Sequence, residues 1–262
     1  MDLDMEGNSA LVTASSRGLG RASAEALVKE GVNVVINGRD EDRLNETVDE
    51  LRKMNGGAVI GQPGDLMEKE DIVKMVERAH QEFGGIDHLI TCVGGPPSMP
   101  FRKSTDEDWY RSFDLLVMSV VRLVRESLDH LEKGEGSIVN ITSISVKEAI
   151  EGLVLSNSVR MSVIGLMKTL SKELGPDVRV NAVLPGPHET ARIQELIYSG
   201  MEEGQFDSYQ EGLDSWSEDI PLKRIGKPSE LGDLVAFLCS KRASYINGTA
   251  IPVDGGGSSS NL

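Results

Sequence analysis

The fold is decided by the stretch Thr13-Ala14-Ser15-Ser16-Arg17-Gly18-Leu19-Gly20, which stands between an apolar strand-like run and a helix-like segment. Its small residues allow the backbone to approach a pyrophosphate, and the helix that follows offers free N–H groups and a positive dipole end. Such a loop alone is a weak signal. Placed between a strand and a helix near the start of the chain, it predicts a dinucleotide-binding site.

Strand-like runs alternate with helical stretches along the rest of the chain. The predicted strands cover residues 9–13, 33–37, 58–61, 88–92, 137–141, 179–183 and 249–253, and the predicted helices cover 22–30, 40–54, 69–83, 104–131, 155–174 and 228–240. A capping-box pattern at Ser104–Glu107 is expected to open the long helix. Strands separated by such helices form parallel βαβ units. Residues 1–262 are therefore predicted to form one doubly wound α/β domain of the Rossmann type.

The segment 191–219 departs from this alternation. It is acidic and helix-leaning, and it carries Tyr198, Tyr209 and Trp216. It follows the C-terminal end of a predicted strand, which is where α/β sheets bind ligands. We interpret it as a flap over a substrate site; the alternative is a pair of surface helices without that role.

The end of the second strand distinguishes between the two nicotinamide cofactors. NAD-binding sites commonly place an acid there for the ribose 2′-hydroxyl, and that acid would repel a 2′-phosphate. This chain has Asn37-Gly38-Arg39, with no acid before Asp40. Arg39 and Arg17 can supply two guanidinium forks for the phosphate. The sequence thus favours NADP(H) over NAD(H), unless Arg39 is only a solvated loop residue.

Composition narrows the classes of partner. The net charge is −15, with 42 acidic against 27 basic residues, which argues against nucleic acid as a partner. We find no apolar run approaching the roughly 20 residues of a membrane span and no secretion signal at the start of the chain. Cys92 and Cys239 stand in apolar contexts and are expected to be reduced core residues. These features predict a cytoplasmic protein that acts on a small molecule.

Several motifs carry a resemblance to a known family. The first loop is similar to the pattern Thr-Gly-x-x-x-Gly-x-Gly, with Ala14 in place of the first glycine. Asp65 resembles the family's adenine-contacting acid, and Asn181–Thr190 resembles its nicotinamide-side loop. Val253-Asp254-Gly255-Gly256 resembles its C-terminal segment. Together, over nearly the whole chain, these motifs resemble short-chain dehydrogenases/reductases, in particular 3-oxoacyl-(acyl-carrier-protein) reductases and glucose 1-dehydrogenases.

The resemblance implies a seven-stranded sheet, a nicotinamide cofactor, and a homotetramer or homodimer packed through the two long helices. It also implies which residues contact the cofactor. These are Thr13, Ser15, Ser16, Arg17, Gly18, Leu19, Arg39, Asp65, Leu66, Val93, Gly94, Arg160, Pro185, Gly186, His188 and Thr190.

The catalytic positions depart from the family pattern. The family uses an asparagine, a serine, a tyrosine and a lysine. Here Leu116 takes the asparagine position, Ser143 keeps the serine, Ser156 takes the tyrosine position and Arg160 takes the lysine position. An aliphatic hydroxyl is a far weaker acid than a phenol, and an arginine does not release its proton. We therefore expect Ser143, Ser156 and Arg160 to form the catalytic group, without the family's usual proton donor.

Three interpretations follow. The first, which we favour, is an NADP-dependent oxidoreductase that interconverts a carbonyl and an alcohol, with another group delivering the proton. The second is a degenerate member that binds NADP(H) as a sensor or assembly partner, and the third is a reaction without hydride transfer, such as water addition or isomerisation. Candidate proton donors under the first interpretation are His188, Lys147, Glu148, Tyr198 and Tyr209.

Overall fold

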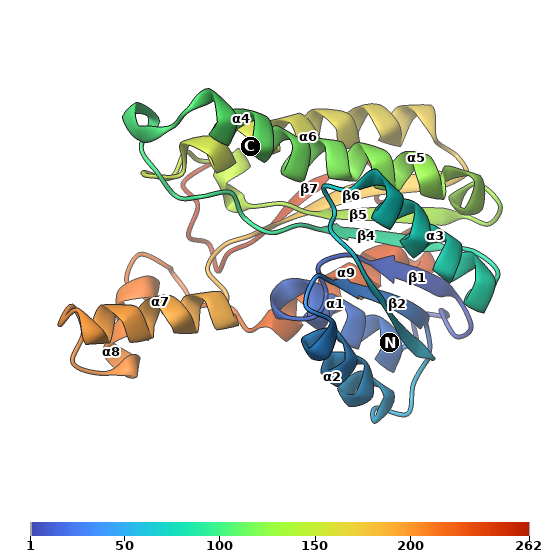
Figure 1. Cartoon of the computed structure of the whole chain (residues 1–262), viewed down its shortest axis with the longest axis horizontal. Coiled ribbons are helices and arrows are strands. Elements are labelled where there is room, and N and C mark those ends of the chain that lie inside the picture. Colours follow the sequence, from blue (N-terminus) through green and yellow to red (C-terminus); the bar gives the residue numbers. More distant parts are fainter. Residues whose placement is uncertain (1, 262) are drawn as a thin grey trace.

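Seven parallel strands form one sheet in the order β3-β2-β1-β4-β5-β6-β7 (Figure 1). The computed structural model describes residues 2–261, with the backbone alone at position 192; positions 1 and 262 of the predicted domain lie outside the described residues. The strands are β1 Ser9–Val12, β2 Asn33–Gly38, β3 Val59–Pro63, β4 His88–Cys92, β5 Gly136–Ile141, β6 Val178–Pro185 and β7 Ala250–Val253.

Helices cover both faces of this sheet (Figure 1). They are α1 Gly18–Lys29, α2 Glu41–Arg52, α3 Lys69–Phe83, α4 Asp106–Phe113, α5 Ser119–Leu131, α6 Val154–Glu173 and α9 Pro228–Cys239. Helices α7 Ala191–Glu202 and α8 Tyr209–Ser217 lie apart from the sheet (Figure 1). One apolar cluster joins the sheet to α1, α2 and α9, and a second joins it to α3, α5 and α6. Because both faces are covered, the central strands are buried and rich in apolar residues.

The order of the strands positions the site. The chain winds outward from β1 to β3 and then returns to place β4 on the other side of β1, with Val12 paired to Ile90. The C-terminal ends of β1 and β4 flank this reversal, and β5 lies next to β4, with Cys92 paired to Ile141. Doubly wound sheets bind ligands in the crevice at such a reversal. The loops that follow β1, β4 and β5 therefore meet at one edge.

The predicted doubly wound, seven-stranded Rossmann sheet is confirmed, whereas several boundaries were wrong. Helix α1 begins at Gly18, four residues before the predicted start at position 22. The helix predicted over 104–131 is divided by a π-helical turn at Asp114–Met118. Its capping box joins Thr105 to Asp108, one residue later than predicted, because the Thr105 side chain accepts the Asp108 N–H and the Asp108 side chain accepts the Thr105 N–H.

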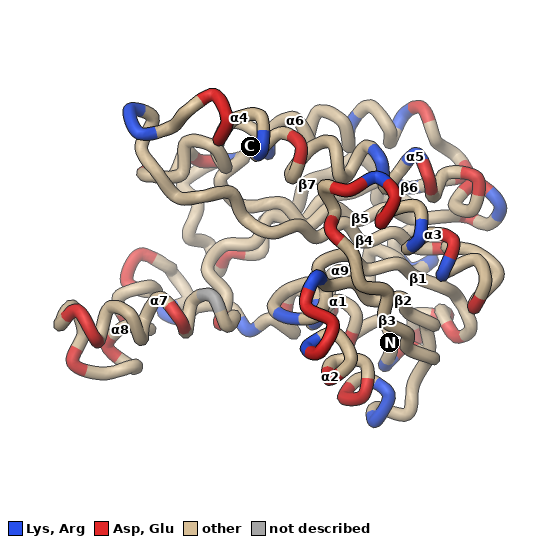
Figure 2. The backbone as a smooth tube through the Cα atoms, viewed as in Figure 1, with Lys and Arg blue, Asp and Glu red and all other residues tan. Residues whose placement is uncertain are grey.

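Charged side chains of both signs are interspersed over the helices, and the flap helices are mainly acidic (Figure 2). Cys92 and Cys239 are both unpaired thiols, as predicted. Within residues 2–261, none of the helices combines the length and apolarity needed to cross a membrane.

A buried histidine lies at the opposite edge of the sheet from these loops. His88 opens β4 and is 3% exposed. Its two ring nitrogens lie 3.0 Å from Asn8 Nδ2 and 2.9 Å from Ser137 Oγ. Burial lowers the pKa of His88 to about 4; Asp87 opposes this shift and Arg179 adds to it. The ring is therefore neutral in the folded protein at neutral pH.

His88 should make the fold sensitive to acid. Its pKa is lower in the folded state than in the unfolded state, so its stabilising contribution is present above pH 6.5 and is lost as pH falls toward 4. Between pH 7 and pH 5 the free energy of unfolding should drop by about 2 kcal/mol more in the parent protein than in a His88→Gln variant. Urea unfolding at both pH values measures this difference. His80→Gln, at an exposed histidine, is the control; a parent-like drop in His88→Gln would contradict the prediction.

Candidate active site

The turn after β1 is held in shape by an asparagine that the sequence analysis did not single out. Ala14 adopts a positive φ of 44°, which costs a non-glycine residue about 1–2 kcal/mol. Asn37, at the end of β2, accepts the Ala14 N–H through its Oδ1 at 3.1 Å. Its Nδ2 donates to the carbonyls of Gln62 and Gly64 at 3.2 and 3.1 Å. Asn37 thus ties this turn to the loop after β3 and offsets the strain at Ala14.

Two predicted cofactor residues use their hydroxyls inside the protein. Thr13 Oγ1 donates to the Cys92 carbonyl at 2.7 Å and accepts the Cys92 N–H at 3.0 Å, which joins the ends of β1 and β4. Ser15 Oγ donates to the Val12 carbonyl at 2.6 Å and accepts the Asn37 N–H at 3.0 Å. Both residues are fully buried, so their side chains shape the loop from inside.

The two arginines predicted to bind a phosphate are exposed and each faces a carboxylate. Arg39 Nη1 lies 3.8 Å from Asp65 Oδ2, and Arg17 Nη1 lies 3.4 Å from Glu195 Oε1 of α7. Exposed pairs of this kind are worth less than about 1 kcal/mol. Both guanidinium groups are therefore available to a stronger anion at low cost.

Ser143 and Ser156 are brought to one place, and a third serine connects them. Ser143 ends the loop after β5 and accepts the Ser145 N–H through its Oγ at 3.1 Å. Ser145 Oγ lies 3.0 Å from Ser156 Oγ, and both of these residues are buried. Ser145 was not predicted; its spacing of two residues from Ser143 was the available signal. Among the described residues none accepts a hydrogen bond from the Ser143 hydroxyl, so it can donate to a ligand.

Arg160 lies against the loops that follow β4 and β5. Its Nη1 donates to the Thr142 carbonyl at 3.2 Å and its Nη2 to the Gly94 carbonyl at 3.4 Å. The side chain is 7% exposed, and its Nε has no hydrogen-bond partner among the described residues. Burial lowers the pKa of this guanidinium from its ordinary value, against the effect of the nearby Cys92. An arginine nevertheless stays charged in proteins.

Cys92 is the neutral neighbour of this cation. Burial raises the pKa of its thiol to about 11, although the charge of Arg160 and a hydrogen bond from the Gly20 backbone both act in the opposite direction. Cys92 therefore carries no charge at neutral pH and does not balance Arg160.

Leu116 occupies the π-helical turn and is 1% exposed. It belongs to the same apolar cluster as Ile144, Val159 and Val163, which come from the loop after β5 and from α6. Leu116 therefore contributes to core packing. A π-helical turn within a helix frequently marks a functional site, and here it packs near the loop after β5 that carries Ser143.

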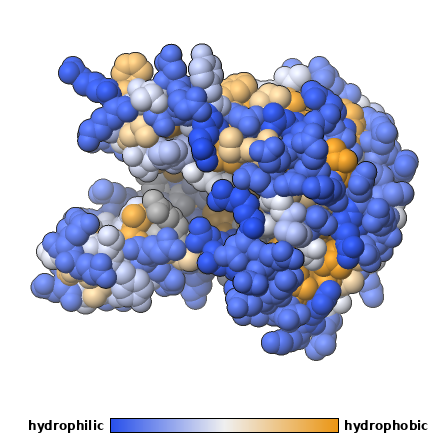
Figure 3. Space-filling model, viewed as in Figure 1, coloured by the Kyte–Doolittle hydropathy of each residue, from blue (hydrophilic) through white to orange (hydrophobic). Residues whose placement is uncertain are grey.

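The loop after β4, which contacts Arg160 through Gly94, also contacts the segment before α6. An isolated bridge pairs Met99 with Leu153, so the loop after β4 lies beside the segment that precedes α6. Helices α7 and α8 pack on each other around a small apolar core of their own. The space-filling view is hollowed between this flap and the part that carries α4 (Figure 3).

Besides the Arg17–Glu195 pair, two further contacts join the flap and its N-terminal end to the β6 loop and the first loop. Tyr209 donates its hydroxyl to Glu189 Oε1 at 3.1 Å, and its ring lies 5.4 Å from that of Tyr198. A Cβ built on Gly18 would lie 3.8 Å from Thr190 Cγ2, so the N-terminus of α7 approaches the first loop. Glu189 was missed by the sequence analysis, and its place inside the nicotinamide-side motif was the only available signal.

His188 takes up a different environment from the serines. It is 4% exposed, and its Nδ1 lies 2.9 Å from the Gly186 carbonyl, while its Nε2 has no partner among the described residues. Burial lowers the pKa of the His188 ring. The ring lines a pocket with Arg224, Glu230 and Asp254, and neither Ser143 nor Arg160 lines that pocket. We therefore leave His188 out of the chemistry proposed below.

The other candidate donors are likewise engaged elsewhere or exposed. Glu148 is exposed and accepts the Ser259 N–H at 2.8 Å, and Lys147 ends the short turn after Ser143.

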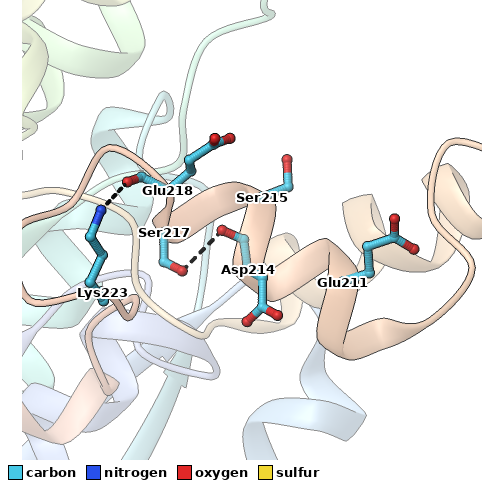
Figure 4. Close-up of a pocket in the computed structure, with 6 residues that line it drawn as sticks. All are labelled: Glu211, Asp214, Ser215, Ser217, Glu218 and Lys223. Carbon is cyan, nitrogen blue, oxygen red and sulfur yellow. Dashed lines mark hydrogen bonds between the residues drawn. The ribbon is translucent and has the colours of Figure 1, made fainter.

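A shallow acidic hollow lies on the outside of α8 (Figure 4). There Ser217 Oγ donates to the Asp214 carbonyl at 3.1 Å, and Lys223 Nζ donates to the Glu218 carbonyl at 2.7 Å. These polar groups therefore stabilise the segment that follows α8.

The remaining predicted contacts line the same edge of the sheet. Leu66 is buried and Asp65 half-buried after β3, and Val93 and Gly94 follow β4. Pro185 and Gly186 end β6, and a Cβ on Gly186 would lie 2.8 Å from the Asp254 Cβ, so glycine is required there. Ser16, Gly18 and Leu19 are partly exposed at the start of α1.

Comparison with known proteins assigns the family. A family model described as Enoyl-(Acyl carrier protein) reductase matches residues 13–258. The chain is 34% identical over 258 residues to a 3-oxoacyl-[acyl-carrier-protein] reductase of Aquifex aeolicus, covering 98% of this chain and 99% of that protein.

Solved structures agree with this assignment. L-sorbose reductase of Gluconobacter frateurii, complexed with NADPH and L-sorbose, superposes with a TM-score of 0.95 at 32% identity, over 99% of this chain and 100% of that one. An NADPH-bound short-chain oxidoreductase of Pseudomonas aeruginosa PAO1, described as containing an atypical catalytic center, gives a TM-score of 0.89 at 27% identity, over 96% and 97%. The chain belongs to the short-chain dehydrogenase/reductase family.

Proposed function

We propose that this protein is an NADP(H)-dependent oxidoreductase that interconverts a carbonyl and an alcohol on a small molecule. The observation that carries the proposal is that Arg160 donates to the carbonyl of Thr142, the residue before Ser143, and to that of Gly94, where β5 and β4 end. A hydroxyl that can donate and a buried cation lie where a dinucleotide-binding sheet presents its ligand. Such a pair can stabilise negative charge on a carbonyl oxygen.

The residues present fit a dinucleotide. A Cβ on Gly94 would meet no described atom within 4 Å, and in the described chain no side chain caps the N-terminus of α1. That helix end can hold the pyrophosphate beside Thr190, while Arg17 and Arg39 can hold a 2′-phosphate. Arg160 has N–H groups left for ribose hydroxyls. The bound cofactor would supply or accept the hydride.

The chain's own groups can support reduction without a tyrosine. Ser143 donates to the carbonyl oxygen, and the charge of Arg160 favours the alkoxide that develops there. An alkoxide is basic enough to take its proton from a water molecule, which leaves as hydroxide. The Ser145–Ser156 hydroxyl pair extends this polar surface behind the substrate.

The substrate is proposed to be a keto, sugar or 3-oxoacyl compound. The similar proteins named above are reductases of L-sorbose and of 3-oxoacyl carrier-protein substrates. In this chain the loop that contains Met99 pairs with the segment before α6, and the flap borders the hollow seen in Figure 3. These three segments would select the substrate. We further propose that the protein forms a homotetramer or homodimer, because the apolar side chains of Tyr110, Phe113 and Met161 on α4 and α6 are exposed. We also propose that it is cytoplasmic.

The direct test combines binding with turnover. Purified protein should bind NADPH at micromolar concentration and oxidise it with at least one member of a panel of ketones, aldehydes, sugars and 3-oxoacyl thioesters. Binding without turnover would instead support the sensor interpretation. Absence of binding would overturn the proposal altogether.

The cofactor preference should depend on Arg39. The parent protein should bind NADPH more tightly than NADH, and Arg39→Ala should largely erase that preference, because a charge-assisted hydrogen bond contributes about 1.5–3 kcal/mol. Affinities from fluorescence titration measure the change. Arg43→Ala, at a neighbouring exposed arginine paired with Asp40 at 3.8 Å, is the matched control. Equal affinities in the parent protein would refute the preference.

A further inference from the structure

Two arginines are deeply placed in this fold, and they differ in how their charge is balanced. Arg179 donates to five carbonyl oxygens at the C-terminal end of α9 and just beyond it, where the helix dipole is negative. The acceptors are the carbonyls of Leu238, Cys239, Ser240, Ala243 and Ile246. Arg160 donates to two neutral loop carbonyls, and its Nε has no partner in the part of the chain that is described.

The charge of Arg160 has no counter-ion in the described residues. Among residues 2–261, no carboxylate lies within ion-pair distance of its guanidinium. Its titratable neighbour, Cys92, is neutral and does not balance the charge. Buried charges in proteins are normally paired, so an unpaired cation at 7% exposure is exceptional.

We propose that the unbalanced charge of Arg160 makes the site discriminate between the redox states of its cofactor, binding NADPH more tightly than NADP⁺. This inference rests on the proposed function, because it places the nicotinamide half of the cofactor beside the loops that Arg160 joins. The two forms of the cofactor share the same adenine, phosphates and riboses. They differ in the nicotinamide ring, which carries a positive charge only in the oxidised form.

The physical reason is repulsion between like charges at a place poorly screened by water. Arg160 cannot lose its proton, so the repulsion persists at every working pH. Two like charges a few ångströms apart in a protein interior repel each other strongly enough to weaken binding severalfold or more. A site of this kind takes the reduced cofactor from a mixed pool and releases the oxidised one after hydride transfer. It therefore operates as a reductase.

The missing tyrosine makes this discrimination possible. A phenol beside a cation can ionise, and the resulting phenolate would neutralise the cation. Ser156 cannot do this, because an aliphatic hydroxyl does not ionise in this range. The replacement of a tyrosine–lysine pair by Ser156 and Arg160 thus converts a site whose charge can be balanced into one that is permanently positive.

The test measures the dissociation constants of the full chain for NADPH and for NADP⁺ and takes the ratio of the second to the first. Titration calorimetry with NADPH and with NADP⁺ should show at least about a tenfold preference for NADPH, equivalent to about 1.4 kcal/mol. Arg160→Gln should reduce this ratio severalfold, because it removes the charge. Arg160→Met removes the same charge and replaces Arg160→Gln if that variant does not fold. Arg160→Lys keeps the charge and should keep the ratio. A purely structural role for Arg160 would change both affinities together and leave the ratio intact.

The adenine end of the site provides the matched control. Arg39→Gln should weaken NADPH and NADP⁺ equally, because the 2′-phosphate is the same in both. Equal affinities in the parent protein, or a ratio unchanged in Arg160→Gln and Arg160→Met, would overturn this inference and leave the proposed oxidoreductase function standing. Failure of the parent protein to bind either form would overturn the proposed function itself.

Discussion

Replacing Ser143 by alanine should lower kcat for carbonyl reduction by about 10²- to 10³-fold, the usual cost of removing one preorganised donor to a developing oxyanion. The structure gives the reason. Ser143 Oγ accepts the Ser145 N–H at 3.1 Å, which fixes the direction of the oxygen and leaves its own hydrogen for the substrate. The measurement is steady-state NADPH oxidation at saturating substrate, once the screen has identified one.

The binding of NADPH should change little in Ser143→Ala, because the proposed cofactor contacts lie elsewhere. Ser145→Ala is the matched control: it removes a neighbouring hydroxyl but keeps the backbone N–H that orients Ser143. A loss in Ser145→Ala as large as that in Ser143→Ala would assign the effect to the serine network as a whole. A kcat unchanged in Ser143→Ala would remove Ser143 from the proposed chemistry.

Much of the frame of this site could be predicted because it follows from local patterns. The loop Thr13–Gly20 lies between a strand and a helix, and the two differ in the spacing of their apolar residues. Its position at the end of a strand could therefore be predicted without knowing any tertiary contact. Arg39 follows the end of β2 directly, so its place at this edge could be predicted from the strand alone. The parallel order followed from the alternation of strands and helices.

The parts that could not be predicted depend on contacts between distant segments. Asn37 supports the turn at Ala14 across 23 residues of chain, and no local pattern encodes that bond. The direction of His188 is set by its packing against Gly226, whose added Cβ would lie 2.8 Å from the ring Nε2. The π-helical turn at Asp114–Met118 has a helical sequence pattern and was therefore absorbed into one long predicted helix.

The absence of a charge partner for Arg160 was equally hidden in the sequence. A chain with 42 acidic residues suggests that any arginine would find one. Acidic residues are spread over the helices of the chain (Figure 2), whereas Arg160 donates to carbonyls of the loops after β4 and β5. Only the fold separates the two, and that separation is what gives this site its permanent charge.

Restoring the family's proton donor should produce the largest gain in activity. The triple variant Leu116→Asn, Ser156→Tyr and Arg160→Lys should raise kcat for carbonyl reduction by about 10²-fold or more, since a positioned general acid contributes typically 10²–10⁴. The new phenol would have a lysine beside it to lower its pKa. The rate of reduction should then fall as pH rises through that pKa, a dependence that Ser156 cannot give to the parent protein.

The three changes are not equally easy for the fold to accept. Leu116 is 1% exposed among apolar side chains, so an asparagine there leaves a buried amide to be satisfied and costs about 1–3 kcal/mol. The double variant Ser156→Tyr and Arg160→Lys avoids that cost and shows whether the phenol and lysine suffice. A rise in pH-dependent activity would mean that the parent site lacks only its acid. A fall in native activity in both variants would show that Ser156 and Arg160 carry out a chemistry of their own, for which the lost tyrosine is not a defect.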